Sequence, residues 1–332
     1  MINFRFHLVS LVAVFLALAL GVVMGSTVID RAIVDRLSSQ IRAVEQRSNE
    51  RRKENLELKA SLGGLEAFAD QVVPQVVGRR LTGVTLTVVA VRGVDGDAVR
   101  AATDTLRAAG AALPGVMWIE PSFAVPDSDA QARLGAAMGD PTDQGTALRQ
   151  AAVEALGRRL AIGPEPTSGT RPVLAGGQDL LTALSAGGFV AFDTQGGPQV
   201  NLASWPQAGS RLLVIDGSQG KVETTVAALP LVRAAAATGA VVALAEVFRP
   251  TDTVKARGPV VQGVRGDHDL ATRVATVDDL EESRGRVAVV LALEELGRGR
   301  AGHYGEGPGA SRQLPEPVAA APGAASAAVP NQ

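Results

Sequence analysis

The sequence predicts an α/β protein: an N-terminal transmembrane helix and coiled-coil stalk followed by one mostly parallel, Rossmann-like α/β domain. Three observations predict this class. An uncharged apolar run comes first, a heptad pattern follows it, and short β-branched runs then alternate with helical segments. The expected boundaries are 1–29 for the anchor, 30–76 for the stalk, 77–305 for the α/β domain and 306–332 for a disordered tail rich in Pro and Ala.

The apolar run covers residues 8–29 and contains no charge and no proline. About 20 apolar helical residues cross a bilayer core, so this run is long enough to do so. Arg5 precedes it, and the positive-inside rule then places the N-terminus in the cytoplasm and the remainder outside. A cleaved signal peptide is the alternative, with Ala17-Leu18-Ala19 or Gly25-Ser26 as candidate cleavage sites. We expect an uncleaved signal-anchor.

The stalk is predicted from apolar residues at heptad spacing between residues 30 and 73. The expected dimerisation seam consists of Leu37, Ile41, Val44, Asn55, Leu58, Leu62 and Leu65. An Asn at a seam position favours a parallel, two-stranded coiled coil, so we expect a homodimer through the stalk. The alternative is one amphipathic helix that folds onto its own domain. Pro74 is expected to end the helix in both cases.

The α/β domain is predicted from two strand–helix–strand units, which imply parallel strands. The helices are expected at 97–112, 130–138, 142–162, 178–186 and 221–238, with Asp97 capping the first. The strands are expected at 84–91, 115–119, 189–192, 211–216, 240–247 and 273–277. Residues 286–293 (RVAVVLAL) suit a last strand or a buried helix, and we favour the strand.

Composition limits the chemistry. With no Cys, the chain has no disulfide, thiolate zinc site or Cys nucleophile. A net charge of −2 offers no electrostatic basis for binding nucleic acid. We expect no enzyme activity and see no evident cofactor.

The most distinctive local motif is RLLVIDGSQGK at 211–221, a buried strand followed by a glycine turn. It is not a P-loop, because Ile215 and Val222 stand where Gly and Ser or Thr are needed. Asp216 likewise replaces the first Gly of a nucleophile elbow. We expect a plain turn capped by Asp216 and Ser218, with binding of a small anion as one alternative.

A hydrolase is a further alternative for this motif, with Ser218 as nucleophile and His268 or His303 as partner. These two histidines are also the weak candidates for metal ligands. His268 lies between two aspartates, and His303 precedes Tyr304. Neither has a Cys, Met or second His at ligand spacing, so the residues themselves predict no strong copper site.

An acidic cluster consists of Asp278, Asp279, Glu281 and Glu282. Negative charge complements a helix N-terminus, so we expect a solvated cap, begun by Asp278-Asp279. Ligation of a hard metal ion is the alternative.

Two segments, 1–31 and 276–305, resemble the MctB family of actinobacteria (MINFRFHLVSLVAVFLALALGVVMGSTVIDR and TVDDLEESRGRVAVVLALEELGRGRAGHYG). The resemblance implies copper transport and copper homeostasis at the cell envelope, and that family is described as an outer-membrane protein. Only this resemblance implies that copper is the transported ion. No family copper ligand matches a motif here.

Relatives are also linked to cell separation. The resemblance therefore implies a second role: a membrane-anchored dimeric coiled-coil scaffold that binds an envelope protein partner controlling wall hydrolysis.

Overall fold

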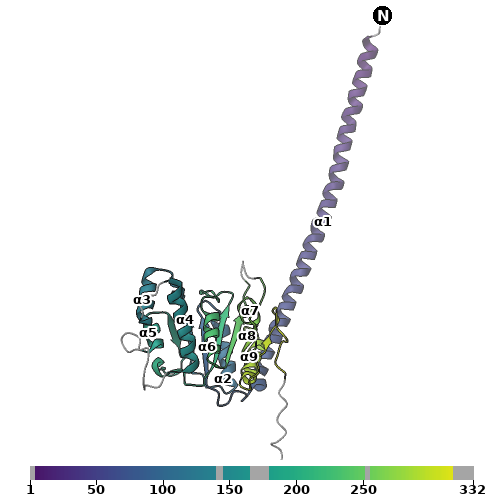
Figure 1. Cartoon of the computed structure of the whole chain (residues 1–332). Helices are drawn as coiled ribbons and strands as arrows, with labels where there is room; N and C mark the ends of the chain where they lie inside the picture. Colours follow the sequence, from purple (N-terminus) through teal and green to yellow (C-terminus); the bar gives the residue numbers. More distant parts are fainter. Residues whose placement is uncertain (1–3, 140–144, 165–178, 251–254, 317–332) are drawn as a thin grey trace, which may run out of the picture. The chain divides into compact units, whose positions relative to one another are not determined.

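The computed structural model describes residues 4–139, 145–164, 179–250 and 255–316. They fall into two compact units, Met1–Leu65 and Glu66–Gln332. Helix α1 (Phe4–Val77) forms the first unit and contributes its last turns to the second. The second unit is otherwise an α/β domain (Figure 1).

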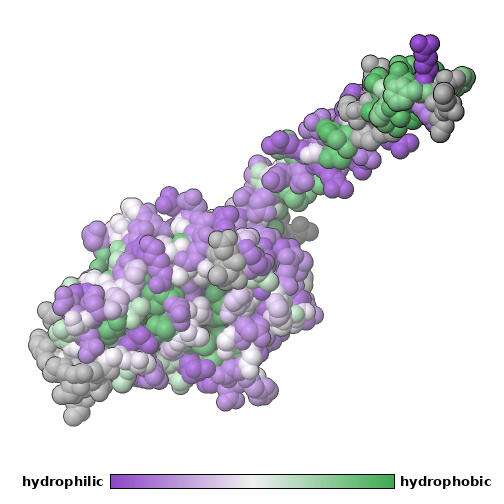
Figure 2. Space-filling model, turned by 90° about the horizontal axis from the view of Figure 1, so that it is seen from above, coloured by the Kyte–Doolittle hydropathy of each residue, from purple (hydrophilic) through white to green (hydrophobic). Residues whose placement is uncertain are grey.

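The first unit contains one segment that is long and apolar enough to cross a membrane. This segment, Phe4–Gly25, has a mean hydropathy of 2.7 and is 0% buried. Figure 2 shows its apolar side chains at the N-terminal end of α1. Length and composition thus agree with the predicted transmembrane helix.

The predicted seam residues lie on this helix and are uncovered in the single chain. Leu37, Ile41 and Val44 are 52–61% exposed, and Leu58, Leu62 and Leu65 are 62–66% exposed. Asn55 is also exposed. One chain does not test the coiled coil, which stays a prediction.

The α/β domain contains a seven-stranded sheet with the order β3-β2-β1-β4-β5-β6-β7. Only the β2–β3 pair is antiparallel, so the predicted mostly parallel sheet is confirmed. The strands are β1 (Leu86–Val91), β2 (Val116–Ile119), β3 (Val190–Asp193), β4 (Arg211–Gly217), β5 (Val242–Val247), β6 (Val274–Val277) and β7 (His303–Tyr304).

Helices cover both faces of the sheet. Every residue of β1, β2, β5 and β6 is buried, and successive strand residues point to opposite faces. The helices are α2 (Gly96–Ala108), α3 (Ser128–Met138), α4 (Gly145–Ile162), α5 (Leu180–Ala186), α6 (Ala228–Ala237), α7 (Pro259–Arg265), α8 (His268–Ala271) and α9 (Ser283–Leu296), with short 3₁₀ turns at Pro121–Ala124 and Leu202–Ser204.

Neighbouring helices pack closely within each layer. A Cβ at Gly157 of α4 would lie 2.6 Å from the carbonyl oxygen of Leu231 in α6. One at Gly263 of α7 would lie 2.7 Å from Leu229 of α6. Helices α4, α6 and α7 therefore form one layer, and α2 packs beside α9.

The prediction of a strand at 286–293 is wrong, because these residues belong to helix α9. The run is apolar on nearly all sides because α9 is buried on nearly all sides, from Val287 to Leu293. A helix in such surroundings has no polar stripe, so its sequence looks like that of a buried strand.

Three helix boundaries also differ from the predictions. Helix α6 begins at Ala228 rather than 221, since Pro230 suits only the first turn of a helix. The α2 cap is Asp95, whose carboxylate accepts from the N–H of Asp97. Helix α1 continues through Pro74 to Val77.

The domain continues past Gly305, where the sequence analysis placed its end. The backbone N–H groups of Glu306 and Gly307 donate to the Asp278 carboxylate at 2.9 and 3.1 Å. These contacts order a segment that composition alone marked as tail. The remainder of the predicted tail, 317–332, lies outside the described residues.

Candidate functional site

The carboxyl edge of the sheet collects several acidic side chains. Asp216 ends β4, Glu246 lies in β5, and Asp278 follows β6. In open α/β sheets, ligands bind at this edge where the strand order reverses, here between β1 and β4.

The crevice expected at that point is filled by the protein itself. The N–H of Lys221, after β4, donates to the carbonyl oxygen of Arg92, after β1, at 2.7 Å. A Cβ at Gly93 would lie 2.5 Å from the carbonyl oxygen of Gln219. The two loops therefore pack directly on each other and leave no room for a nucleotide between them.

The glycine turn at 217–220 is a structural turn. The Asp216 carboxylate is fully buried, accepts from the N–H of Gly217 at 2.8 Å and from the Thr224 hydroxyl at 2.6 Å. The Asp216 carboxylate thus occupies the turn with its own oxygens, where the anion-binding alternative had placed a bound small anion. Burial raises the pKa of Asp216 to about 6.

The hydrolase alternative finds no support in the geometry. The Ser218 hydroxyl donates to the carbonyl oxygen of Arg249 at 2.6 Å and accepts from its N–H at 3.0 Å. Within the described residues, no hydrogen bond joins Ser218 to His268 or His303. Ser218 therefore connects two loops, whereas the prediction had it capping its own turn.

The Glu246 side chain holds the start of α7. It is fully buried and accepts from the N–H groups of Gly258 and Val260 at 3.0 and 3.1 Å. Burial, together with the nearby charge of Asp278, raises the pKa of Glu246 to about 7. No motif in the sequence pointed to this residue. The only hint was a Glu inside an otherwise apolar strand.

Asp278 and Asp279 are not a solvated helix cap, which corrects the prediction. Both are 0% exposed. Asp278 pairs with Arg265 at 2.7 Å, and that guanidinium is only 2% exposed. Asp279 pairs with Arg284 at 3.0 Å, and burial raises its pKa to about 6. These guanidinium groups make the burial tolerable. Arg284 follows Asp279 by only five positions, but Arg265 comes from α7, a contact that the local pattern could not show.

The rest of the cluster is also paired. Arg257 contacts both Glu281 and Glu282, and Glu282 is the N-cap residue of α9 without a side-chain cap bond. Guanidinium groups thus occupy the positions where a metal ion would lie. Within the described ranges, no group of three or more His, Asp or Glu side chains is arranged to hold a metal.

The two histidines lie on different elements and are not brought together. His268 is the exposed first residue of α8. His303 is in the edge strand β7, where its Nδ1 lies 2.9 Å from the Thr276 hydroxyl. Burial and the neighbouring Arg265 lower the pKa of His303, so its imidazole is neutral near pH 7. Each remains at most a lone ligand.

The base of α1 completes the N-terminus of α9, a contact that sequence reasoning missed. Glu66 accepts from the N–H and the hydroxyl of Ser283 at 2.8 and 2.7 Å. Asp70 pairs with Arg286, whose side chain is 6% exposed. Glu66 therefore acts as the cap that α9 lacks locally.

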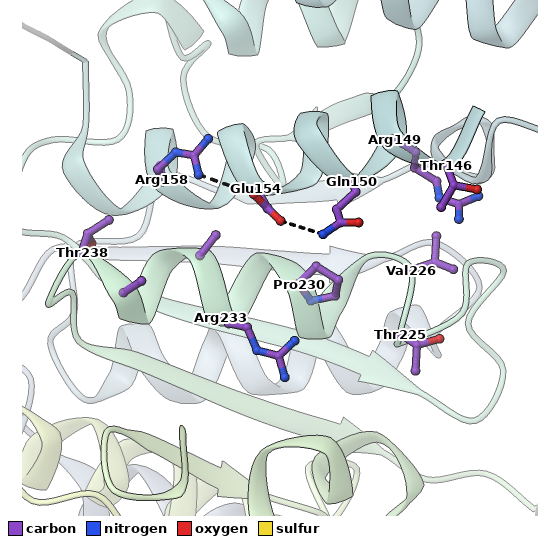
Figure 3. Close-up of a pocket in the computed structure, with 12 residues that line it drawn as sticks. Thr146, Arg149, Gln150, Glu154, Arg158, Thr225, Val226, Pro230, Arg233 and Thr238 are labelled. Atoms are coloured by element: carbon purple, nitrogen blue, oxygen red, sulfur yellow. Dashed lines mark hydrogen bonds and ion pairs between the residues drawn. The ribbon is translucent and has the colours of Figure 1, made fainter. Parts of the chain in front are cut away.

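A groove of about 550 Å³ lies between α4 and α6 (Figure 3). Its α4 wall includes Arg149, Glu154 and Arg158, and its α6 wall includes Arg233 and Ala234. Such a volume falls within the range of ligand sites, roughly 300–1,000 Å³. No motif in the sequence pointed to this groove.

Comparison with known proteins gives a match along nearly the whole chain. Residues 1–315 match a family model described as "Copper transport outer membrane protein, MctB". Copper transporter MctB of Mycobacterium tuberculosis (strain H37Rv) is 28% identical over 321 residues, which is 93% of this chain and 98% of the relative. The protein of the same name from Mycobacterium leprae is 26% identical over 329 residues, 94% and 98% of the two chains.

Proposed function

The chain belongs to the MctB family, and from this premise we propose that it acts in copper homeostasis at the cell envelope. One observation carries the proposal. The similarity to proteins named copper transporters extends over 98% of their length, so the anchor and the α/β domain are both shared.

The apolar segment Phe4–Gly25 supports a membrane-anchored arrangement. We propose that it stays in the mature protein, with the N-terminus in the cytoplasm and the α/β domain outside. The positive charge of Arg5 before the segment favours this orientation.

The chemistry of the described residues supports a role that needs no tight copper site within one chain. Soft copper ions prefer Cys, Met and His ligands, and the chain has no Cys and only three His. Asp278, Asp279 and Glu282 are paired with arginines, and Asp216 and Glu246 accept hydrogen bonds from nearby N–H and hydroxyl groups. We propose a non-enzymatic, tethered component of copper handling.

The test compares cellular copper, measured by elemental mass spectrometry, in cells that lack the gene and carry either the full chain or variants. The full chain should lower copper content, and a His268→Ala/His303→Ala variant should do so equally well. Loss of this effect in the double variant, at equal protein level, would show that the histidines are needed for copper handling and would contradict a role without histidine ligands. No effect of the full chain itself would refute the role in copper homeostasis.

A second proposal concerns the stalk, and the exposed seam supports it. Large apolar side chains that recur at heptad spacing, each more than half exposed, are stabilised when a second helix covers them. We propose that the stalk forms a parallel two-stranded coiled coil with a second copy of this chain. Binding of a partner that controls wall hydrolysis stays a prediction.

The absence of native cysteine makes the stalk easy to test by crosslinking. In a parallel dimer, Ile41→Cys places two thiols side by side, and mild oxidation should give a disulfide-linked dimer. Gln46→Cys, five residues on and on the outer face of the heptad, is the matched control and should stay monomeric on denaturing gels. Equal crosslinking of both variants would contradict the register.

A further inference from the structure

The groove between α4 and α6 is lined almost entirely by hydrogen-bond donors and small apolar groups. Three guanidinium groups, the amide of Gln150 and the hydroxyls of Thr146 and Thr225 provide the donors. The Thr238 hydroxyl donates to the carbonyl oxygen of Ala235 at 2.7 Å, and Arg149 donates one N–H to that of Ala124 at 3.2 Å. Pro230, Ala234 and Ala237 supply small apolar surface. Figure 3 shows these side chains on the two facing helices and on the loop before α6.

The positive charges are spread along the groove rather than gathered at one point. Arg149 and Arg158 are nine positions apart on α4, which corresponds to about 13 Å along a helix. Arg233 lies on the opposite wall. A single phosphate could not reach all three, but an extended chain with carboxylates about four residues apart spans this distance.

Among the described residues of the lining, the one carboxylate, that of Glu154, is already paired. Glu154 lies 3.7 Å from the Arg158 guanidinium and accepts from the Gln150 amide at 3.0 Å. Arg233 pairs with Asp267 at 3.2 Å, outside the groove lining. Arg158 and Arg233 are 53% and 55% exposed, and ion pairs this exposed are weak. A better placed carboxylate can therefore replace either partner.

We propose that this groove is a docking surface for an extended, acidic peptide segment of a partner protein. Charge complementarity favours that occupant. A bilayer surface does not fit a hollow between two helices, and the lining residues that the structure describes include no aromatic ring on which nucleic acid bases could stack. The inference is independent of copper handling.

The test uses the full chain in nanodiscs of zwitterionic lipid and a fluorescent peptide of about twelve residues, with Glu at every fourth position and Ala and Ser between. Fluorescence anisotropy gives the affinity at low salt. We expect Arg158→Gln/Arg233→Gln to weaken binding at least about tenfold, because two charge contacts are lost. The same peptide with Gln for Glu should bind at least about tenfold more weakly to the unaltered chain.

The control removes the same charge elsewhere. Arg52 in the stalk and Arg100 on α2 are exposed and lie outside the groove. Arg52→Gln/Arg100→Gln should leave the affinity within about twofold of the unaltered chain.

A variant that binds the peptide more tightly separates a loss of affinity from a loss of folding. Glu154→Gln removes the competing carboxylate and should tighten binding about threefold, which an unfolded domain could not do. Equal affinity of the unaltered chain and Arg158→Gln/Arg233→Gln would overturn the proposal. The proposal would also be overturned if binding to phosphatidylglycerol vesicles required these arginines and binding to the peptide did not. The groove would then recognise a membrane surface.

Discussion

Replacing Asp70 by Asn tests whether the base of α1 stabilises the α/β domain. The Arg286 guanidinium is nearly buried and contacts the Asp70 carboxylate, the carbonyl oxygen of Glu281 at 2.8 Å and the Ser283 hydroxyl at 3.0 Å. Asn preserves the size of the side chain and removes its charge. The buried guanidinium then keeps its two neutral acceptors and the more distant Glu66 carboxylate, which lies 3.8 Å away.

The magnitude follows from the exposure of the two partners. Removing one member of a fully buried ion pair costs about 3–5 kcal/mol. Asp70 is 53% exposed, and two neutral acceptors remain, so we expect the free energy of unfolding to fall by about 1–2 kcal/mol. Glu66→Ala removes the α9 cap and should cost about 1 kcal/mol. Both variants act on Ser283, so their effects should not add fully.

Urea unfolding of the full chain in mild detergent measures the effect. The two tryptophans, Trp118 and Trp205, lie in the α/β domain and are 6% exposed, so their fluorescence reports its unfolding. Asp104→Asn breaks an exposed pair with Arg107 and should change stability by less than about 0.5 kcal/mol. If Asp70→Asn costs no more than this control, the pair with Arg286 does not stabilise the domain and the reasoning fails.

Three further predictions use the same unfolding measurement. The folded state binds a proton at Glu246 more tightly than the unfolded chain does, because its pKa rises from 4.5 to about 7. Stability is therefore lost as pH rises from 4.5 to 7, and Glu246→Gln should flatten that decline by up to about 1.4 kcal/mol per pH unit; an unchanged slope would contradict the assignment. Gly157→Val forces α4 away from α6 and should cost about 1–3 kcal/mol, whereas Gly63→Ala, with open space around it, should not destabilise. Ser218→Ala should cost about 1 kcal/mol through its two lost hydrogen bonds and leave cellular copper content unchanged; a strong rise in copper would revive a chemical role for this serine.

Much of the fold was predictable because it depends on local patterns. A membrane-length helix follows from an uninterrupted apolar run, and buried parallel strands follow from short β-branched runs between helices. The run at 286–293 was mistaken for a strand because burial on all sides removes the periodicity that separates a helix from a strand.

The candidate sites were less predictable. The turn after β4 and its cap by Asp216 were correctly predicted, because a glycine run between a buried strand and a helix favours a turn. The contact of Ser218 with Arg249 was not predicted. Pairing of the acidic cluster with Arg257 and Arg265 could not be foreseen, because nothing in the local sequence shows which distant guanidinium will reach a carboxylate.

By itself, the sequence determined a helix long enough to cross a membrane and a mostly parallel α/β domain, because hydropathy and periodicity act over a few neighbouring residues. Only the tertiary structure decided that Asp278 and Glu246 are buried, that the loops after β1 and β4 close the expected ligand crevice, and that Glu66 caps a helix 217 positions away. These outcomes depend on which surfaces meet when the sheet and its helices assemble, and charges and orphan N–H groups then take the partners that packing brings within reach.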